Sequence, residues 1–168
     1  MRTTVSTGRT HLKINRTKPF DPEDFLDQPY WLIWCGPVNR DGFKGKPQQC
    51  VASLALVSID LAKVRLVACL KGKEIVVNGE EFLHRLKRAK HLRLDAQVLQ
   101  ALLQNQHLIP DAWKKVERVC FMGTELLLAP SGQRYVLFLK WNGTEWCFGY
   151  ERLTSDFGAD TPAAVGGV

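Results

Sequence analysis

Two runs of apolar residues on either side of Asn142-Gly143 carry the clearest hydrophobic pattern in the chain. Residues 134–141 and 144–151 are rich in the aromatic and aliphatic side chains that are typical of strands. Asn-Gly readily adopts the positive φ angles that a type I′ turn requires. We therefore predict a two-residue β-hairpin in which Trp141 lies opposite Thr144.

In this register, one face of the hairpin collects most of its large side chains, and we expect that face to be core. Its members are Tyr135, Leu137, Leu139, Trp141, Trp146, Phe148 and Tyr150. The other face carries Val136, Phe138 and Cys147 between charged pairs. Because Trp141 adjoins the turn, it is the aromatic residue of the hairpin that we expect to be exposed. An exposed aromatic patch suits protein recognition, so Trp141 and Asn142 are candidate partner-binding residues.

Two further apolar runs precede the hairpin. Residues 119–122 and 125–128 are strand-like, and Gly123-Thr124 separates them. Together with the hairpin, they predict four antiparallel strands that follow one another in sequence.

Helical and buried segments lie upstream of these strands. Residues 80–89 and 96–103 have apolar side chains at helical spacing, and Asn78 and Asp95 are suitable N-caps for them. Residues 30–35 form a compact apolar run that is typical of a buried strand. We predict an α+β fold, in which a C-terminal four-stranded antiparallel meander is covered by two helices and an N-terminal strand.

The chain of 168 residues is long enough for one well-buried domain, which we place at residues 19–155. Residues 156–168 are mostly small, and we expect them to form a flexible tail. Residues 1–18 are expected to form a flexible basic arm, because they hold five of the basic residues and no acidic one. These basic residues are Arg2, Arg9, Lys13, Arg16 and Lys18. The remaining 18 basic and 17 acidic residues nearly balance, although the whole chain carries +6.

The expected localisation of the protein rests on two kinds of segment that the sequence lacks. No apolar run approaches the roughly 20 residues that span a bilayer, and the first residues lack the apolar stretch of a secretory signal. We therefore expect a cytoplasmic protein that does not contact membranes. Five widely spaced cysteines without a C-x-x-C pair indicate reduced thiols rather than disulfides.

The longest predicted loop covers residues 36–50, which include three Gly and two Pro. It lacks the G-x-x-x-x-G-K-[ST] spacing of a phosphate-binding loop, so we predict no nucleotide there. Loops often carry binding residues, and Phe43 and Lys44 are candidate partner-binding residues within it.

A basic cluster suggests a second kind of partner. Five cations lie within ten residues, at the end of the first predicted helix and in the turn after it. These are Arg85, Lys87, Arg88, Lys90 and Arg93. Cations near a helix C-terminus are favoured by the helix dipole without any partner, and the following helix exposes no Arg or Lys. A solvated helix face is therefore the favoured interpretation, and nucleic-acid binding is the alternative.

Several segments also carry a resemblance. They are Ser53-Leu54-Ala55-Leu56 with Asp60-Leu61, Arg93-Leu94-Asp95-Ala96, residues 105–114 (NQHLIPDAWK) and residues 137–146 (LFLKWNGTEW). With these segments, the chain resembles a family of small uncharacterised bacterial proteins over about residues 18–165. The resemblance implies an intracellular bacterial domain with a Trp-Asn-Gly hairpin, and it implies no particular activity.

No catalytic, cofactor or metal-binding motif stands out in the sequence, so we expect neither a cofactor nor a metal ion. The favoured function is non-enzymatic binding of a macromolecular partner, in particular a protein. Nucleic-acid binding through the basic arm and residues 85–93 is one alternative. An enzyme whose pocket is assembled from distant residues is another.

Overall fold

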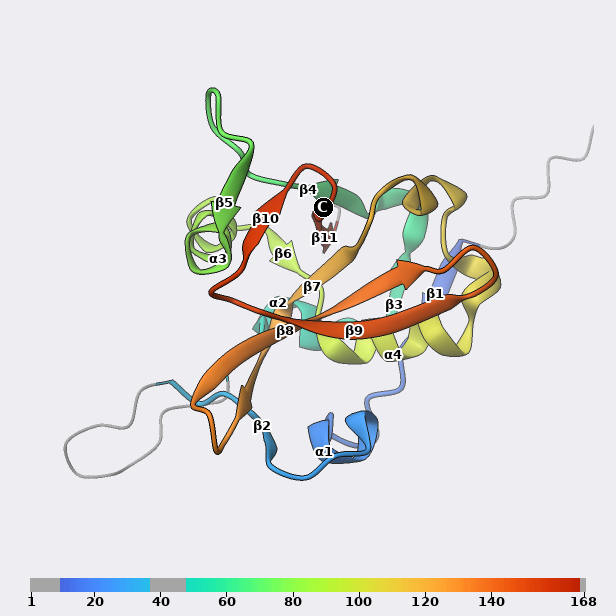
Figure 1. The fold of residues 1–168 in the computed structure, drawn as a ribbon. Helices are drawn as coiled ribbons and strands as arrows, with labels where there is room; N and C mark the ends of the chain where they lie inside the picture. The colour runs from blue at the N-terminus through green and yellow to red at the C-terminus, as the bar shows by residue number, and fades with distance from the viewer. Residues whose placement is uncertain (1–9, 37–47, 167–168) are drawn as a thin grey trace, which may run out of the picture.

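A mixed seven-stranded β-sheet forms the centre of the computed structural model, which describes residues 10–36 and 48–166 (Figure 1). Five of its strands lie in the order β4-β11-β7-β8-β9, while β2 pairs with β7 and β6 pairs with β11. The strands are β2 (Trp31–Ile33), β4 (Arg65–Val67), β6 (Leu92–Arg93), β7 (Val119–Leu128), β8 (Gln133–Trp141), β9 (Trp146–Arg152) and β11 (Ala163–Gly166). All pairs in this sheet are antiparallel except β11 with β7, which is parallel.

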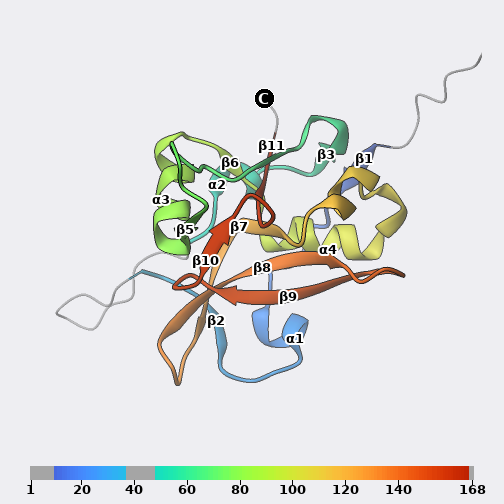
Figure 2. The same cartoon turned by 45° about the horizontal axis from the view of Figure 1, so that its top comes forward.

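Two small antiparallel ribbons accompany the main sheet. One pairs β1 (His11–Lys13) with β3 (Ser58–Asp60), and the other pairs β5 (Val76–Asn78) with β10 (Asp156–Gly158). The β5–β10 ribbon lies beside α3 in both views (Figures 1 and 2).

The described helices are short. They are α1 (Pro22–Leu26), α2 (Val51–Leu54), α3 (Gly79–Arg88) and α4 (Ala96–Gln104), with 3₁₀ turns at Leu61–Lys63, Gln106–Leu108 and Asp111–Lys115. The side chains of Asn78 and Asp95 accept hydrogen bonds from the backbone N–H of Glu80 and Gln97, which caps α3 and α4. The expected helices and their caps are confirmed.

Apolar side chains pack on both faces of the sheet around β8. Leu137 and Leu139 belong to the same core cluster as the apolar face of α4, whereas Val136 belongs to a second cluster with Phe82 and Leu86 of α3. Because successive residues of a strand point to opposite faces, α3 and α4 cover different faces of the sheet. The α+β class is confirmed, and the helices do cover the sheet, one on each face.

The predicted four-stranded meander is only partly confirmed. Residues 119–128 form one strand, so the meander has the three strands β7, β8 and β9. The expected turn at Gly123-Thr124 is wrong. Gly123 is needed there for close approach, since its N–H donates to the carbonyl of Leu94 at 2.9 Å and a Cβ would lie 2.4 Å from the carbonyl oxygen of Arg93. The pairing of β7 with β8 shifts its register between Phe121 and Leu126 instead.

The hairpin forms with a four-residue connection rather than the predicted two-residue turn. Trp141 pairs with Trp146, not with Thr144. The side-chain oxygen of Asn142 accepts from the N–H groups of Thr144 and Glu145, which stabilises this longer loop. Since the register differs from the prediction by two residues, every side chain keeps its predicted face of the sheet.

Both predicted chain ends need correction. Residues 11–13 form β1, and Arg16 makes a largely buried ion pair, so residues 10–18 are not an arm. Residues 1–9 lie outside the described part of the chain. The tail prediction is wrong for residues 156–166, because they form β10 and β11 and the side chains of β11 are buried. Small side chains there permit close packing between neighbouring strands rather than flexibility.

Candidate functional site

The outer edge of β9 is the most distinctive surface feature of the sheet. β9 pairs with β8 on one side, and no strand in the described residues pairs with it on the other. The hydrogen bond from the N–H of Leu153 to the carbonyl of Arg134 shows that odd-numbered residues of this segment face β8. The backbone groups of the even-numbered residues therefore point outward.

Side chains and the following turn close both ends of this edge. At one end, the amide of Gln106 donates to the carbonyl of Trp146 at 3.2 Å and accepts from the N–H of Trp146 at 3.0 Å. At the other end, the N–H of Arg152 donates to Oε1 of Glu151 at 3.0 Å, and the carbonyl of Arg152 accepts from the N–H of Ser155 at 3.1 Å. Gln106 thus takes the place of a neighbouring strand at Trp146.

Between these ends, Phe148 and Tyr150 have outward N–H and C=O groups. These four groups have no hydrogen-bond partner in the part of the chain that the structure describes. They are donors and acceptors in the arrangement that an added strand would complete.

The side chains of the same two residues are exposed aromatic rings. Phe148 is 38% exposed and Tyr150 is 39% exposed. The ring of Phe148 lies 4.5 Å from that of Phe25, and the ring of Tyr150 lies 4.8 Å from that of the buried Trp31. We call Phe25, Phe148 and Tyr150 the β9 patch. The core assignment of Phe148 and Tyr150 is therefore wrong, because β9 is the edge strand of the main sheet and both side chains are partly exposed there.

The predicted tip of the hairpin is less available than its edge. Trp141 is partly buried against Trp146, with 5.6 Å between ring centroids, and the ammonium group of Lys114 lies 4.1 Å from its ring. Asn142 is exposed, but its side-chain oxygen already accepts two backbone hydrogen bonds within the turn. The other two candidate partner-binding residues, Phe43 and Lys44, lie outside the described residues.

Internal partners hold three residues of the predicted basic cluster. Arg85 contacts Glu74 at 2.6 Å and Glu81 at 3.0 Å. Lys87 contacts Glu125 at 3.1 Å, and Arg93 donates to the carbonyl of Met122 at 2.8 Å.

Arg88 and Lys90 are exposed. They are the two cations of the cluster with neither an ion pair nor a side-chain hydrogen bond among the described residues. The structure therefore does not gather the five cations onto one outward surface.

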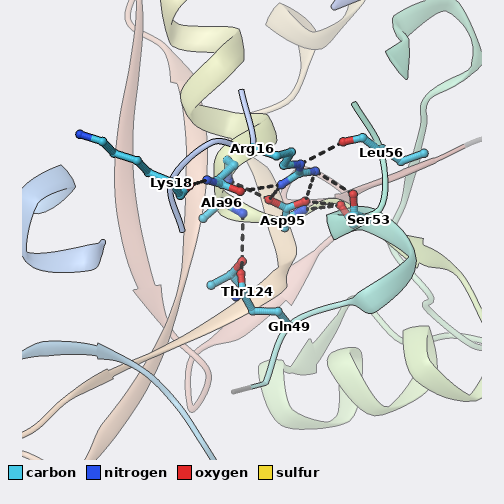
Figure 3. A network of polar contacts seen from close by, with 9 residues as sticks. Arg16, Lys18, Gln49, Ser53, Leu56, Asp95, Ala96 and Thr124 are labelled. Carbon is cyan, nitrogen blue, oxygen red and sulfur yellow. Dashed lines mark hydrogen bonds and ion pairs between the residues drawn. The ribbon is translucent and has the colours of Figure 1, made fainter. Parts of the chain in front are cut away.

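A buried polar network lies where the N-terminal segment meets α2 and α4 (Figure 3). Arg16 donates to both oxygens of Asp95, at 2.8 and 2.9 Å, and to the carbonyl groups of Ser53 and Leu56. The hydroxyl of Ser53 donates to Asp95 and accepts from its N–H. Ser53 and Asp95 are fully buried, so this serine has no access to a substrate, and the network joins segments of the fold.

The described residues offer little for catalysis. Burial raises the pKa of the Cys120 thiol to about 12 and also raises that of Cys69, so neither provides a thiolate at neutral pH. No cluster of His, Cys, Asp and Glu in the described part of the chain could hold a metal ion. A cavity of about 970 Å³ between residues 15–24, β2 and α4 is lined by carboxylates, side-chain amides and apolar groups together with Thr17 and Lys18, without a Ser, His or Cys.

Comparison with protein-family models, with curated proteins and with solved structures gave no match. The resemblance to a bacterial family therefore stays a prediction. Among the described helices, none has the length and apolar character to cross a bilayer.

Sequence reasoning missed the β9 edge although a signal for it existed. The last strand of a meander has a free side unless a later segment pairs with it, and residues 146–152 occupy that position. What the sequence does not indicate is the role of Gln106, whose contact with Trp146 spans 40 residues.

Proposed function

We propose that this protein is a non-enzymatic binding domain that takes up an extended segment of a protein partner along the outer edge of β9. The observation that carries the proposal is that Phe148 and Tyr150 combine exposed aromatic rings with backbone groups that have no partner among the described residues. In strand addition, backbone hydrogen bonds provide affinity, and alternate side chains provide specificity.

The closed ends of the edge define where a partner binds. The side chain of Gln106 is hydrogen-bonded to the backbone N–H and C=O groups of Trp146. Glu151 and Ser155 are hydrogen-bonded to those of Arg152. Along the described residues of this edge, a partner strand therefore gains hydrogen bonds at Phe148 and Tyr150. Two partner side chains, two positions apart, then lie on the same face as the rings of Phe148 and Tyr150.

The alternatives have weaker support. Nucleic-acid binding would need the cations of residues 85–93 to face one surface, and three of the five are held by internal partners. An enzyme would need a nucleophile or general base in a cavity, and the large cavity offers carboxylates of which Asp21 already caps α1.

The test uses peptides selected from a random phage-displayed library against the wild-type protein. Tyr150→Pro removes an outward N–H without removing a bond to β8, and proline is tolerated at such edge positions. We expect it to weaken peptide binding at least about tenfold, since an unmade hydrogen bond and a lost ring contact are each worth about 1 kcal/mol or more. Fluorescence polarisation measures the affinity.

Three further variants separate binding from folding. Tyr150→Phe keeps the N–H and the ring and should bind as the wild type does. Phe148→Lys should weaken binding through charge at the edge. Ile75→Lys alters an 81% exposed apolar residue just before β5, outside the main sheet, and should have no effect.

Hydrogen exchange locates the binding. The amides of Phe148 and Tyr150 should exchange quickly in the free protein and slowly in the complex. Selected peptides that bind Tyr150→Pro as tightly as the wild type, or that protect other amides, would contradict the proposal.

A further inference from the structure

We infer, on the basis of the proposed function, that the segment taken up at β9 is basic as well as apolar. α1 lies next to β9 in both views, and the contact between Phe25 and Phe148 joins the two elements (Figures 1 and 2). The charges of α1 and its flanking residues therefore border the β9 patch.

This border is strongly acidic. Residues 21–27 hold four carboxylates and no basic residue. They are Asp21, Glu23, Asp24 and Asp27, and all four are exposed. None of them forms an ion pair within the described residues.

Most other carboxylates close to the sheet are already neutralised by a partner. Glu125 contacts Lys87 and Arg134, and Glu151 contacts Arg118 at 2.6 Å. Among the described residues, α1 and its flanking residues thus place unpaired acidic charge beside the β9 patch. An apolar surface next to uncompensated carboxylates is complementary to a segment in which Lys or Arg flanks large apolar side chains.

Arg152 makes the two ends of the β9 edge differ in charge. It is exposed, and it lies two residues beyond Tyr150 without an ion pair in the described part of the chain. Glu145 is exposed near the opposite end of β9. The basic residues of the bound segment are therefore placed towards Phe148 and α1, away from Arg152.

A second copy of this chain is a poorer occupant. Pairing about Gly149 would match Phe148 of one copy with Tyr150 of the other and would satisfy all four free backbone groups. It would also bring two acidic α1 segments to the same side of one continuous sheet, where like charges repel. Self-association is therefore the competing outcome of the test.

Three synthetic peptides with one extended apolar core test the inference. The first is flanked by Lys and Arg, the second by Glu, and the third is basic but has proline within its core. At an ionic strength of about 0.05 M, we expect the basic peptide to bind at least about tenfold more tightly than the acidic one. This advantage should shrink at about 0.5 M, because salt screens exposed charges. The proline peptide should not bind.

A matched pair of variants assigns the charge effect to α1. Asp24→Asn combined with Asp27→Asn should reduce the preference for the basic peptide several-fold. Asp156→Asn combined with Asp160→Asn removes the same charge from β10 and the turn after it, outside α1, and should leave the preference unchanged.

The outcomes are distinct. If the acidic peptide binds as tightly as the basic one, strand addition stands and the basic partner is overturned. If neither binds, while light scattering shows a dimer in which Phe148 and Tyr150 amides are protected, the occupant is a second copy and the inference falls. If the basic peptide binds Tyr150→Pro as tightly as the wild type, the proposed function itself fails.

Discussion

Asp95 has three roles at the scale of a single residue. It caps α4, forms the two-point ion pair with Arg16, and accepts a hydrogen bond from Ser53. The sequence predicted the cap, because Asp before a helical pattern is a local signal. The ion pair is not predictable from local patterns, since Arg16 lies 79 residues away in a segment whose charges indicate a basic arm.

Arg16→Met should destabilise the protein by about 3–5 kcal/mol, because it leaves the buried carboxylate of Asp95 without its cation. Urea unfolding followed by tryptophan fluorescence gives the free energy. Lys13→Met, an exposed change three residues earlier, is the control. A loss no larger than that of the control would show that Asp95 does not depend on Arg16.

Glu74 provides a pH-dependent contribution to stability. Hydrogen bonds from Arg85, and then from the N–H of Lys71, lower the pKa of Glu74 from 4.5 to about 2. The folded state thus binds the proton less readily than the unfolded state. Its stabilisation is complete above pH 4.5 and is lost as the pH falls towards 2.

Glu74→Gln should therefore be less stable than the wild type above pH 4.5, and the difference should vanish near pH 2. Urea unfolding at several pH values between these limits measures it. Glu145→Gln, a change at an exposed glutamate that forms no ion pair in the described part of the chain, is the comparison. A difference between Glu74→Gln and the wild type that stays constant with pH would refute the linkage.

At the scale of elements, local sequence patterns predict which helices and strands form, but not always the residues at which they end. Helical spacing and caps identified α3 and α4, because these signals lie within one segment. The faces of the hairpin were correct because side chains alternate along any strand. The register of the hairpin differs from the predicted register, since the side chain of Asn142 stabilises a four-residue loop in place of the type I′ turn.

The β8–β9 pairing contains one close contact that the sequence does not show. Gly149 lies opposite Phe138, and a Cβ on Gly149 would lie 2.5 Å from the Phe138 ring. Gly149→Ala should destabilise the protein by about 1–3 kcal/mol through overpacking. Phe138→Leu should offset part of this loss, so the double variant should be more stable than the sum of the single changes predicts. Additive losses in urea unfolding would show that the ring moves aside freely.

At the scale of the molecule, β11 completes the sheet. It pairs with β4, β6 and β7, and its three apolar side chains are fully buried. Ala163, Ala164 and Val165 give no strong strand signal, so composition alone suggested a tail. Their position depends on pairing with distant segments, which local patterns do not record. The β9 site shares this limit, because an edge is defined by what the rest of the chain leaves unpaired.

Deleting residues 163–168 should abolish cooperative unfolding, because it removes a strand from within the sheet and leaves β4, β6 and β7 without their shared partner. Near-ultraviolet circular dichroism should lose its aromatic signal, and a hydrophobic dye should bind. Val165→Ala, which keeps the strand, should cost about 2 kcal/mol and retain a cooperative transition. A truncated protein that still unfolds in one sharp transition would show that β11 is dispensable.

The central place of β11 also bears on how the protein is made. The ribosome releases the chain from its N-terminal side, so β4, β6 and β7 emerge before the strand that joins them. Until residue 166 has left the ribosome, β7 presents an unpaired edge to the crowded cell. We expect the nascent chain to complete its sheet late in translation or after it, and to depend until then on factors that shield exposed strands.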